Sequence, residues 1–255
     1  MPPRPLILAT LLLATLPPAL RAQRTVHVIV ALCDNANQGI VPVPKALGNG
    51  QDPDRNLYWG AAYGVRTWFN KSTEWVRSQR VAAPSEEILE RVVWKHRSAD
   101  VYLVADAYDG AFIRNATTDL LTYAAGHSGS SIEVEGHRLD IGGAADLLAY
   151  CGHDGLMEFP PPAARKPADN KLRHTIILAC ISKRYFAEPL RTTGASPLLW
   201  TTGLMAPEAY TLAAALTGWI DGGTDEQVRE RAAQAYAEWQ KCGIGAARKL
   251  LVTGW

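Results

Sequence analysis

The chain has 255 residues, of which 26 are basic and 25 acidic, so its formal net charge at pH 7 is only +1. This balance excludes a protein that binds nucleic acid or an anionic membrane surface through bulk positive charge. Four cysteines are too few for a scaffold held together by disulfides, whereas the length is sufficient to bury a substantial hydrophobic core.

The N-terminus predicts an export signal. Arg4 gives a basic start, an uncharged apolar run follows, and Ala22 offers a small residue at which a signal can be cleaved. The run is short and contains two adjacent prolines, so it is poorly suited to span a bilayer, and a retained anchor is the alternative interpretation. We therefore expect residues 1–22 to be a signal peptide and residues 23–255 to be one soluble domain. That domain would be secreted or periplasmic, with no membrane contact after cleavage.

The N-terminal half of this domain shows the patterns of strands and short helices. A strand over 25–32 leads into a long loop, and Asp52 is expected to cap a helix that extends to about Phe69. Residues 73–96 fit either a helix or a strand, and we favour a hairpin with the strand over 101–105. The remaining predicted elements are an acidic loop over 106–110, a helix capped by Asn115 that ends at Gly126, and a hairpin over 131–141.

The C-terminal half alternates strands with helices. The predicted elements are strands over 146–151, 174–180 and 197–202, helices over 207–220 and from Thr224 to about Gln240, and a short helix before Trp255. Such alternation predicts a mostly parallel sheet of five or six strands, covered by helices on both faces. The fold class is therefore α/β, a three-layer sandwich.

Reactive residues follow two of the apolar strands. His153 comes shortly after the strand over 146–151, with Gly155 close behind it, and Cys180 ends the strand over 174–180. If these strands are neighbours, both side chains face one crevice at the carboxyl edge of the sheet. A thiol beside an imidazole is a nucleophile with its own acid and base. Backbone N–H groups at the glycine could bind the developing oxyanion.

These motifs resemble the caspase–legumain–gingipain superfamily of cysteine peptidases. In that superfamily one apolar strand ends in His-Gly and a later one ends in Ala-Cys. This chain has His153-Asp-Gly155 and Ala179-Cys180, and the best likeness is to the legumain type. Gly155 leads into an aliphatic stretch ending in Phe-Pro, and the strand after the cysteine ends in Thr-Thr202, as in that type. Asp154 departs from the pattern because it separates His153 from the glycine.

The resemblance implies a caspase-like domain and a cysteine endopeptidase, or a related amide hydrolase, that acts on a peptide or protein. Cys180 would attack, His153 would be the acid and base, and the N–H groups of Gly155 and Cys180 would hold the oxyanion. No cofactor or metal is implied. The alternative is a catalytically inactive protein of the same fold that binds a peptide or a glycan.

The resemblance also suggests where a substrate would be recognised. Asp34 and Asn35 follow the first strand, where the superfamily lines the pocket for the residue before the cut bond, and Thr202 lies at the matching end of a later strand. An acid at position 34 would favour Lys or Arg. The alternative is that Asp34 and Asn35 only shape a turn.

Two more cysteines, Cys33 and Cys151, also end predicted central strands. Together with His153 and Cys180 they could form a zinc site, although the usual short spacing between ligands is absent. A Cys33–Cys151 disulfide is a second alternative.

Overall fold

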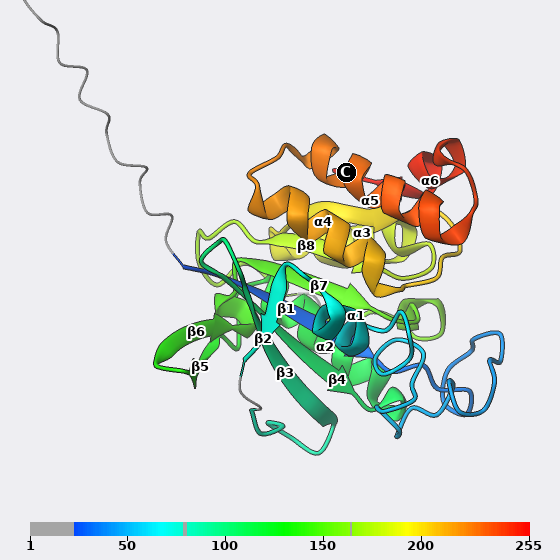
Figure 1. Cartoon of the computed structure of the whole chain (residues 1–255), viewed down its shortest axis with the longest axis horizontal. Helices are drawn as coiled ribbons and strands as arrows, with labels where there is room; N and C mark the ends of the chain where they lie inside the picture. The colour runs from blue at the N-terminus through cyan, green and yellow to red at the C-terminus, as the bar shows by residue number, and fades with distance from the viewer. Residues whose placement is uncertain (1–22, 79–80, 164) are drawn as a thin grey trace, which may run out of the picture.

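A central β-sheet organises the structure, a computed structural model that describes residues 23–78, 81–163 and 165–255 (Figure 1). The expected signal peptide, residues 1–22, lies outside the described residues. The strands of this sheet are β1 (Arg24–Ala31), β2 (Trp75–Arg77), β3 (Ile88–His96), β4 (Val101–Tyr108), β7 (Leu147–Cys151), β8 (His174–Leu178), β9 (Ser196–Thr201) and β10 (Leu251–Val252). A separate hairpin contains β5 (Ser130–Val134) and β6 (His137–Ile141).

The strand order of the eight-stranded sheet is β10-β9-β8-β7-β1-β4-β3-β2. The five consecutive strands from β9 to β4 run parallel, and the antiparallel strands β10, β3 and β2 extend the two edges. The predicted count of five or six strands is too low. The strands β2 and β10 have only three and two residues, which is too short for a hydrophobic period to reveal them.

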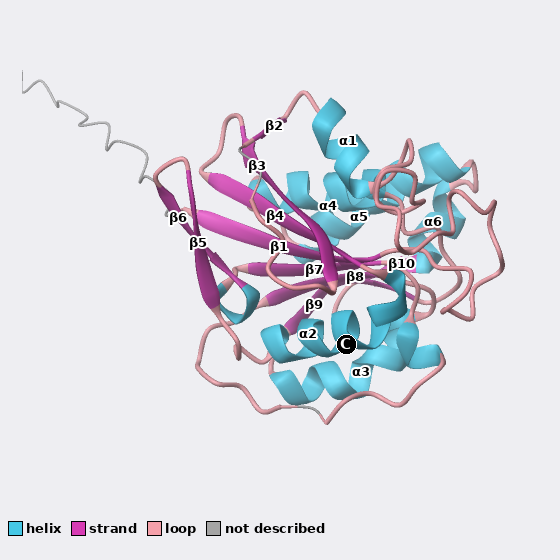
Figure 2. Cartoon of the chain, turned by 90° about the horizontal axis from the view of Figure 1, so that it is seen from below, coloured by secondary structure: helices cyan, strands magenta, loops and turns pink. Residues whose placement is uncertain are grey.

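Helices cover both faces of the sheet, which makes a three-layer α/β sandwich (Figure 2). One face carries α1 (Val65–Lys71), α4 (Ala209–Ile220) and α5 (Asp225–Gln240), with α6 (Ile244–Leu250) packed against α5. The other face carries α2 (Ile113–Ala124) and α3 (Ser182–Thr193). The predicted sandwich with a mostly parallel sheet is therefore confirmed. No helix in the described part of the chain is long and apolar enough to cross a membrane.

The strand β1 shows why both faces are covered. Val26, Val28 and Val30 belong to the core beneath α4 and α5, whereas Ile29 and Ala31 belong to the core beneath α2 and α3. All five side chains are fully buried. Because successive side chains of a strand point to opposite faces, an apolar run without alternation requires cover on both sides.

Several local patterns predicted their elements well. The structure contains the predicted hairpin over 131–141 and the predicted pairing of β3 with β4. It also contains the strands β7 and β8, which lead to the candidate residues. Thr224 and Gln227 form the predicted capping box at the start of α5, with both reciprocal hydrogen bonds. These signals are local, so they do not depend on distant contacts.

The predicted helix from Asp52 to Phe69 is wrong over most of its length. Residues 52–64 form turns, and only α1 is helical. The side chain of Asn56 explains the difference, because it accepts a hydrogen bond from the N–H of Cys33 (3.1 Å) and donates one to the Cys33 carbonyl (2.8 Å). This bridge to the end of β1 holds the segment in an irregular path that sequence periodicity does not reveal.

The predicted acidic loop over 106–110 also needs correction. Asp106 belongs to β4, and its side chain is completely buried. Arg91 of β3 binds both carboxylate oxygens (2.6 and 2.5 Å), and His27 of β1 binds one of them (2.9 Å). Asp106 therefore adds no negative charge to the crevice at the end of the sheet.

Two helical details differ from the predictions. Asn115 lies inside the first turn of α2, where its side chain donates to Glu87, and Phe112 is the capping residue. Helix α3 was not predicted, although it begins directly after the segment that contains Cys180.

Candidate functional site

Cys180 and His153 lie at adjacent strand ends on the carboxyl side of the sheet. The strands β7 and β8 pair in parallel, with Cys151 opposite Leu178. His153 and Cys180 each follow this register pair by two residues. The carboxyl ends of parallel strands are where ligand sites of open α/β sheets form. The two residues therefore occupy the place at which the sequence predicted a catalytic pair.

Cys180 sits on a sharp turn between β8 and α3. The following residue, Ile181, has φ 52° and ψ 28°, which is the left-handed region of backbone conformation. This conformation is unfavourable for a β-branched side chain and costs on the order of 1–3 kcal/mol. Strain of this kind persists where surrounding contacts enforce it, and it concentrates at functional sites.

Hydrogen bonds to β8 and β9 enforce this turn. Ser182 Oγ donates to the Ile177 carbonyl (2.8 Å), and Ser182 N–H donates to Thr201 Oγ1 (3.1 Å). Thr201 Oγ1 in turn donates to the carbonyl of Ala179. The backbone on both sides of Cys180 is thus tied to the sheet, which fixes the position of the turn that carries the thiol.

The Cys180 thiol is half-buried and protonated at neutral pH. Its sulfur accepts a hydrogen bond from the N–H of Met205 (3.4 Å). Burial raises the pKa of the thiol, the Met205 N–H lowers it, and the nearby Asp154 carboxylate raises it again, with a net increase. Nucleophilic attack by this thiol therefore requires a base.

The His153 ring is held by a carboxylate. Its Nε2 forms a short hydrogen bond with Glu158 Oε1, and the same oxygen accepts the N–H of Gly39 (2.5 Å). In the described part of the chain the ring makes no hydrogen bond to Cys180 or to any other group. If Nε2 carries the proton that Glu158 accepts, the other nitrogen, Nδ1, is the basic one.

Asp154 is a buried carboxyl group beside the candidate thiol. Its Oδ1 accepts the N–H of Leu156 (3.0 Å), whereas the buried Oδ2 has no hydrogen-bond partner. Burial raises the pKa of Asp154 to about 7, and the bond from Leu156 opposes this only in part. Since the folded state holds the proton more tightly than the unfolded chain, stability falls as the pH rises from about 4 to 7.

Asp154→Asn is expected to make Cys180 more reactive above pH 7. The ionised Asp154 carboxylate opposes formation of the thiolate, so the neutral amide lowers the pKa of the thiol and speeds alkylation about threefold to tenfold near pH 8.5. Iodoacetamide labelling with peptide mass mapping measures the rate. The exposed Cys242 is an internal control. This role of Asp154 would be contradicted if Cys180 were alkylated at the same rate in both proteins at pH 8.5. It would also be contradicted if the variant reacted faster by the same factor near pH 5.5.

Gly155, the residue predicted to help bind the oxyanion, is buried at the start of the short helical turn Gly155–Met157. A Cβ at this position would come within 2.4 Å of the Phe159 ring, so close packing requires glycine here. Neither the N–H of Gly155 nor that of Cys180 donates a hydrogen bond in the described part of the chain. Neither N–H group is therefore used by the described part of the fold.

Asp34 and Asn35 are occupied by their own loop. Asp34 is buried and accepts side-chain hydrogen bonds from Asn37 (2.8 Å) and Gln51 (3.0 Å). Burial raises the pKa of Asp34, but these bonds and two backbone N–H groups outweigh it and lower the pKa overall. The amide of Asn35 bonds both the N–H and the carbonyl of Val43. This arrangement favours the turn-shaping interpretation over a pocket for Lys or Arg.

Thr202 links β9 to the C-terminal segment. Its hydroxyl donates to the Lys249 carbonyl (2.7 Å), and its N–H donates to the Leu250 carbonyl (2.9 Å). The side chain is exposed, but its hydroxyl proton is already used. These contacts give Thr202 a structural role at the end of β9.

The structure supports neither the zinc site nor the Cys33–Cys151 disulfide that the cysteine positions suggested. All four cysteines are free thiols, so Cys33 and Cys151 do not form a disulfide. Burial raises the pKa of Cys33 to about 11 and that of Cys151 to about 12. Within the described ranges, no group of three His, Cys, Asp or Glu side chains is placed to hold a metal ion. Of the three strand-end cysteines, Cys180 alone is partly exposed.

Sequence reasoning missed three residues around the thiol. Glu158 was noticed only as part of the stretch after Gly155, and Asp154 only as an interruption of a motif. Tyr58 was assigned to a helix, yet its buried hydroxyl lies near both Cys33 and Cys180, whose charges help to raise the pKa of Tyr58. The spacing of Glu158 five residues after His153 was the one available signal.

Comparison of the chain with models of protein families, with curated proteins and with solved structures gives no match.

Proposed function

We propose that this protein is an exported cysteine hydrolase with a caspase-like fold, which cleaves an amide bond in a peptide or protein. The proposal is supported by the carboxyl edge of the parallel sheet, where a strained turn presents a partly exposed thiol and the adjacent strand leads to a histidine that a carboxylate holds. Covalent amide hydrolysis needs a nucleophile, a base and a group that orients the base, and Cys180, His153 and Glu158 would fill these roles. The order of the histidine and cysteine strands also agrees with the superfamily that the motifs resemble.

The proposed reaction begins with transfer of the Cys180 thiol proton to His153 Nδ1. The sulfur bonds to the carbonyl carbon of the substrate, and the N–H groups of Gly155 and Cys180 bind the oxyanion. The imidazolium then protonates the leaving amine as the carbon–nitrogen bond breaks. Water attacks the resulting thioester with His153 again as the base, which releases the acid and restores the thiol.

The strained turn at Cys180 is the observation that carries this proposal. Of the three strand-end cysteines, Cys33 and Cys151 are fully buried, whereas Cys180 is accessible and its backbone is tied to β8 and β9. A cysteine that only fills a core does not require a β-branched neighbour such as Ile181 in the left-handed region.

A fluorogenic peptide library tests the proposal. The purified chain that begins near Gln23 is expected to cleave a subset of the library, and Cys180→Ala is expected to abolish cleavage. Unfolding stability should fall by no more than about 1–2 kcal/mol, because the lost side chain is small. Cys242→Ala is the matched control and should retain full activity, since its thiol lies on the surface after α5. Activity that survives Cys180→Ala would place the chemistry elsewhere.

A second candidate function is a catalytically inactive binding protein with the same fold. The raised pKa of Cys180 favours it, as does the absence of a hydrogen bond between Cys180 and His153 in the described part of the chain, because neither residue activates the other in this arrangement. Absence of cleavage across the library, together with slow alkylation of Cys180 at neutral pH, would select this alternative.

A further inference from the structure

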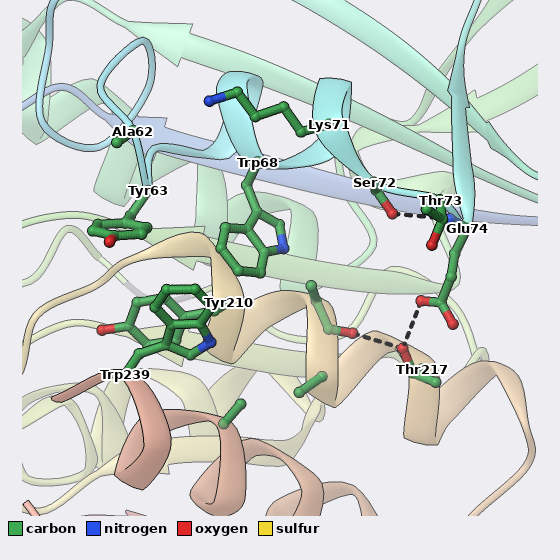
Figure 3. A pocket seen from close by; sticks show the side chains of 13 residues that line it. Ala62, Tyr63, Trp68, Lys71, Ser72, Thr73, Glu74, Tyr210, Thr217 and Trp239 are labelled. Carbon is green, nitrogen blue, oxygen red and sulfur yellow. Dashed lines mark hydrogen bonds between the residues drawn. The ribbon is translucent and has the colours of Figure 1, made fainter. Parts of the chain in front are cut away.

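A cavity of about 710 Å³ lies on the face of the molecule that α1, α4 and α5 cover (Figure 3). Its walls come from the loop before α1, from α1 and the turn after it, and from α4 and α5. Neither Cys180 nor His153 lines it. The mechanism proposed above makes no use of this cavity, and its size suits a small organic ligand.

Four aromatic side chains gather at one end of the cavity: Tyr63, Trp68, Tyr210 and Trp239 (Figure 3). Trp239 stacks on Tyr210 with ring centroids 5.6 Å apart and contacts Trp68 edge to face at 5.3 Å. Tyr63 and Trp239 nevertheless remain 40% and 42% exposed. Large rings are usually buried when they serve only the core, so two half-exposed rings in one concavity offer stacking surfaces to a ligand.

The opposite end of the cavity is polar (Figure 3). The hydroxyl proton of Thr217 can go either to the Ala213 carbonyl (3.0 Å) or to Glu74 Oε2 (3.3 Å), and Glu74 Oε1 has no hydrogen-bond partner in the described part of the chain. Lys71 also lines the cavity, but its ammonium group points toward the side of Ala62 and Tyr63, away from Glu74 (Figure 3), and makes no ion pair or hydrogen bond in the described part of the chain. Ser72 and Thr73 add hydroxyl groups, and alanines of α4 and α5 form a smooth apolar surface between the two ends. The two formal charges of this lining cancel, while donors and acceptors remain unused.

This combination selects among possible ligands. A quaternary ammonium ion needs an open box of ring faces, but these rings pack against one another, and Lys71 would repel the ion. A purely apolar side chain would cover the polar end and leave the Glu74 carboxylate desolvated without a partner. A sugar ring has an apolar C–H face and a rim of hydroxyl groups, so it can stack on aromatic rings while its hydroxyl groups bond a carboxylate.

We propose that this cavity binds a neutral oligosaccharide, with Tyr63 and Trp239 stacking on sugar rings and with Glu74 bonding hydroxyl groups. This binding is independent of the proposed hydrolase. A Cys180→Ala protein is expected to bind the sugar unchanged, so failure of either proposal leaves the other standing.

Isothermal titration calorimetry with cellohexaose, laminarihexaose, chitohexaose and maltohexaose tests the site. At least one of the four is expected to bind with a Kd at or below about 1 mM. Trp239→Ala is expected to weaken that binding about tenfold or more, because the ring supplies a stacking face. Glu74→Gln should weaken it about threefold, and it keeps the fold because Glu74 is exposed and the Thr217 hydroxyl also donates to the Ala213 carbonyl (3.0 Å).

Trp255→Ala is the matched control, because Trp255 is 47% exposed and packs against Trp200, outside the cavity. It should bind like the unmodified protein. Binding of none of the four sugars, or binding that Trp239→Ala leaves unchanged, would overturn the proposal. So would tighter binding of tetramethylammonium or of the peptide acetyl-Phe-Phe-amide that is lost in Trp239→Ala, since the cavity would then belong to a different ligand.

Discussion

His153→Ala is expected to lower amide hydrolysis about a thousandfold, since general acid–base catalysis typically contributes between about a hundredfold and ten thousandfold. The loss should appear in kcat more than in KM, because the imidazole moves protons in the transition state and contributes little to substrate binding. The thiol of Cys180 has a raised pKa, so without the imidazole only a small fraction is thiolate at neutral pH. Steady-state kinetics on the best library substrate measures the effect.

Glu158→Gln separates orientation of the imidazole from proton transfer by it. The amide can still occupy the position beside His153 Nε2 but no longer stabilises the imidazolium, so we expect a loss of about tenfold to a hundredfold, smaller than for His153→Ala. His137→Ala, an exposed substitution on β6, is the matched control. Equal losses in Glu158→Gln and His137→Ala would remove Glu158 from the mechanism.

Arg91→Met is expected to destabilise the fold by about 3–5 kcal/mol, the largest stability effect that the structure suggests. Arg91 binds both oxygens of Asp106 across β3 and β4, and both side chains are almost completely buried. Removal of the cation leaves a buried carboxylate with His27 as its remaining partner. In thermal unfolding the midpoint should fall by roughly 10 °C for a chain of this size.

Two further variants test the cause of this loss. Arg138→Met breaks an ion pair between Arg138 and Asp140, whose side chains are 72% and 60% exposed, respectively. It should lower the free energy of unfolding by less than about 1 kcal/mol. Adding Asp106→Asn to Arg91→Met should recover part of the loss, because no unpaired charge then remains buried. A double variant no more stable than Arg91→Met would show that lost packing, rather than the uncompensated charge, is responsible.

The pH dependence of the Arg91–Asp106 pair has a defined sign. Burial raises the pKa of Asp106, but the bonds from Arg91 and His27 outweigh it and lower the pKa overall. The pair therefore contributes its stability at neutral pH and loses it as the pH falls below the usual carboxyl range. In Arg91→Met the pKa of Asp106 should rise, so the difference in stability between the two proteins shrinks in acid.

The candidate site shows how far a local pattern reaches. The apolar runs of β7 and β8 predicted where His153 and Cys180 lie, because a strand buried on both faces needs such a run whatever its neighbours are. The same runs carry no information on the partners of a side chain. Glu158, which holds His153, and Asp154, which affects Cys180, became visible only when the loops after the strands were folded.

The sequence by itself determined the layered α/β architecture, the strands β7 and β8 that lead to the candidate residues, and the capping box of α5. The signals for all three depend on neighbours within a few residues. Tertiary structure alone decided the chemical roles of the acidic residues. Asp34 bonds Gln51 seventeen positions away, and Asp106 pairs with His27 seventy-nine positions away. The physical reason is that a carboxylate acquires its pKa and function from burial and from the donors around it, and folding brings those donors from distant parts of the chain.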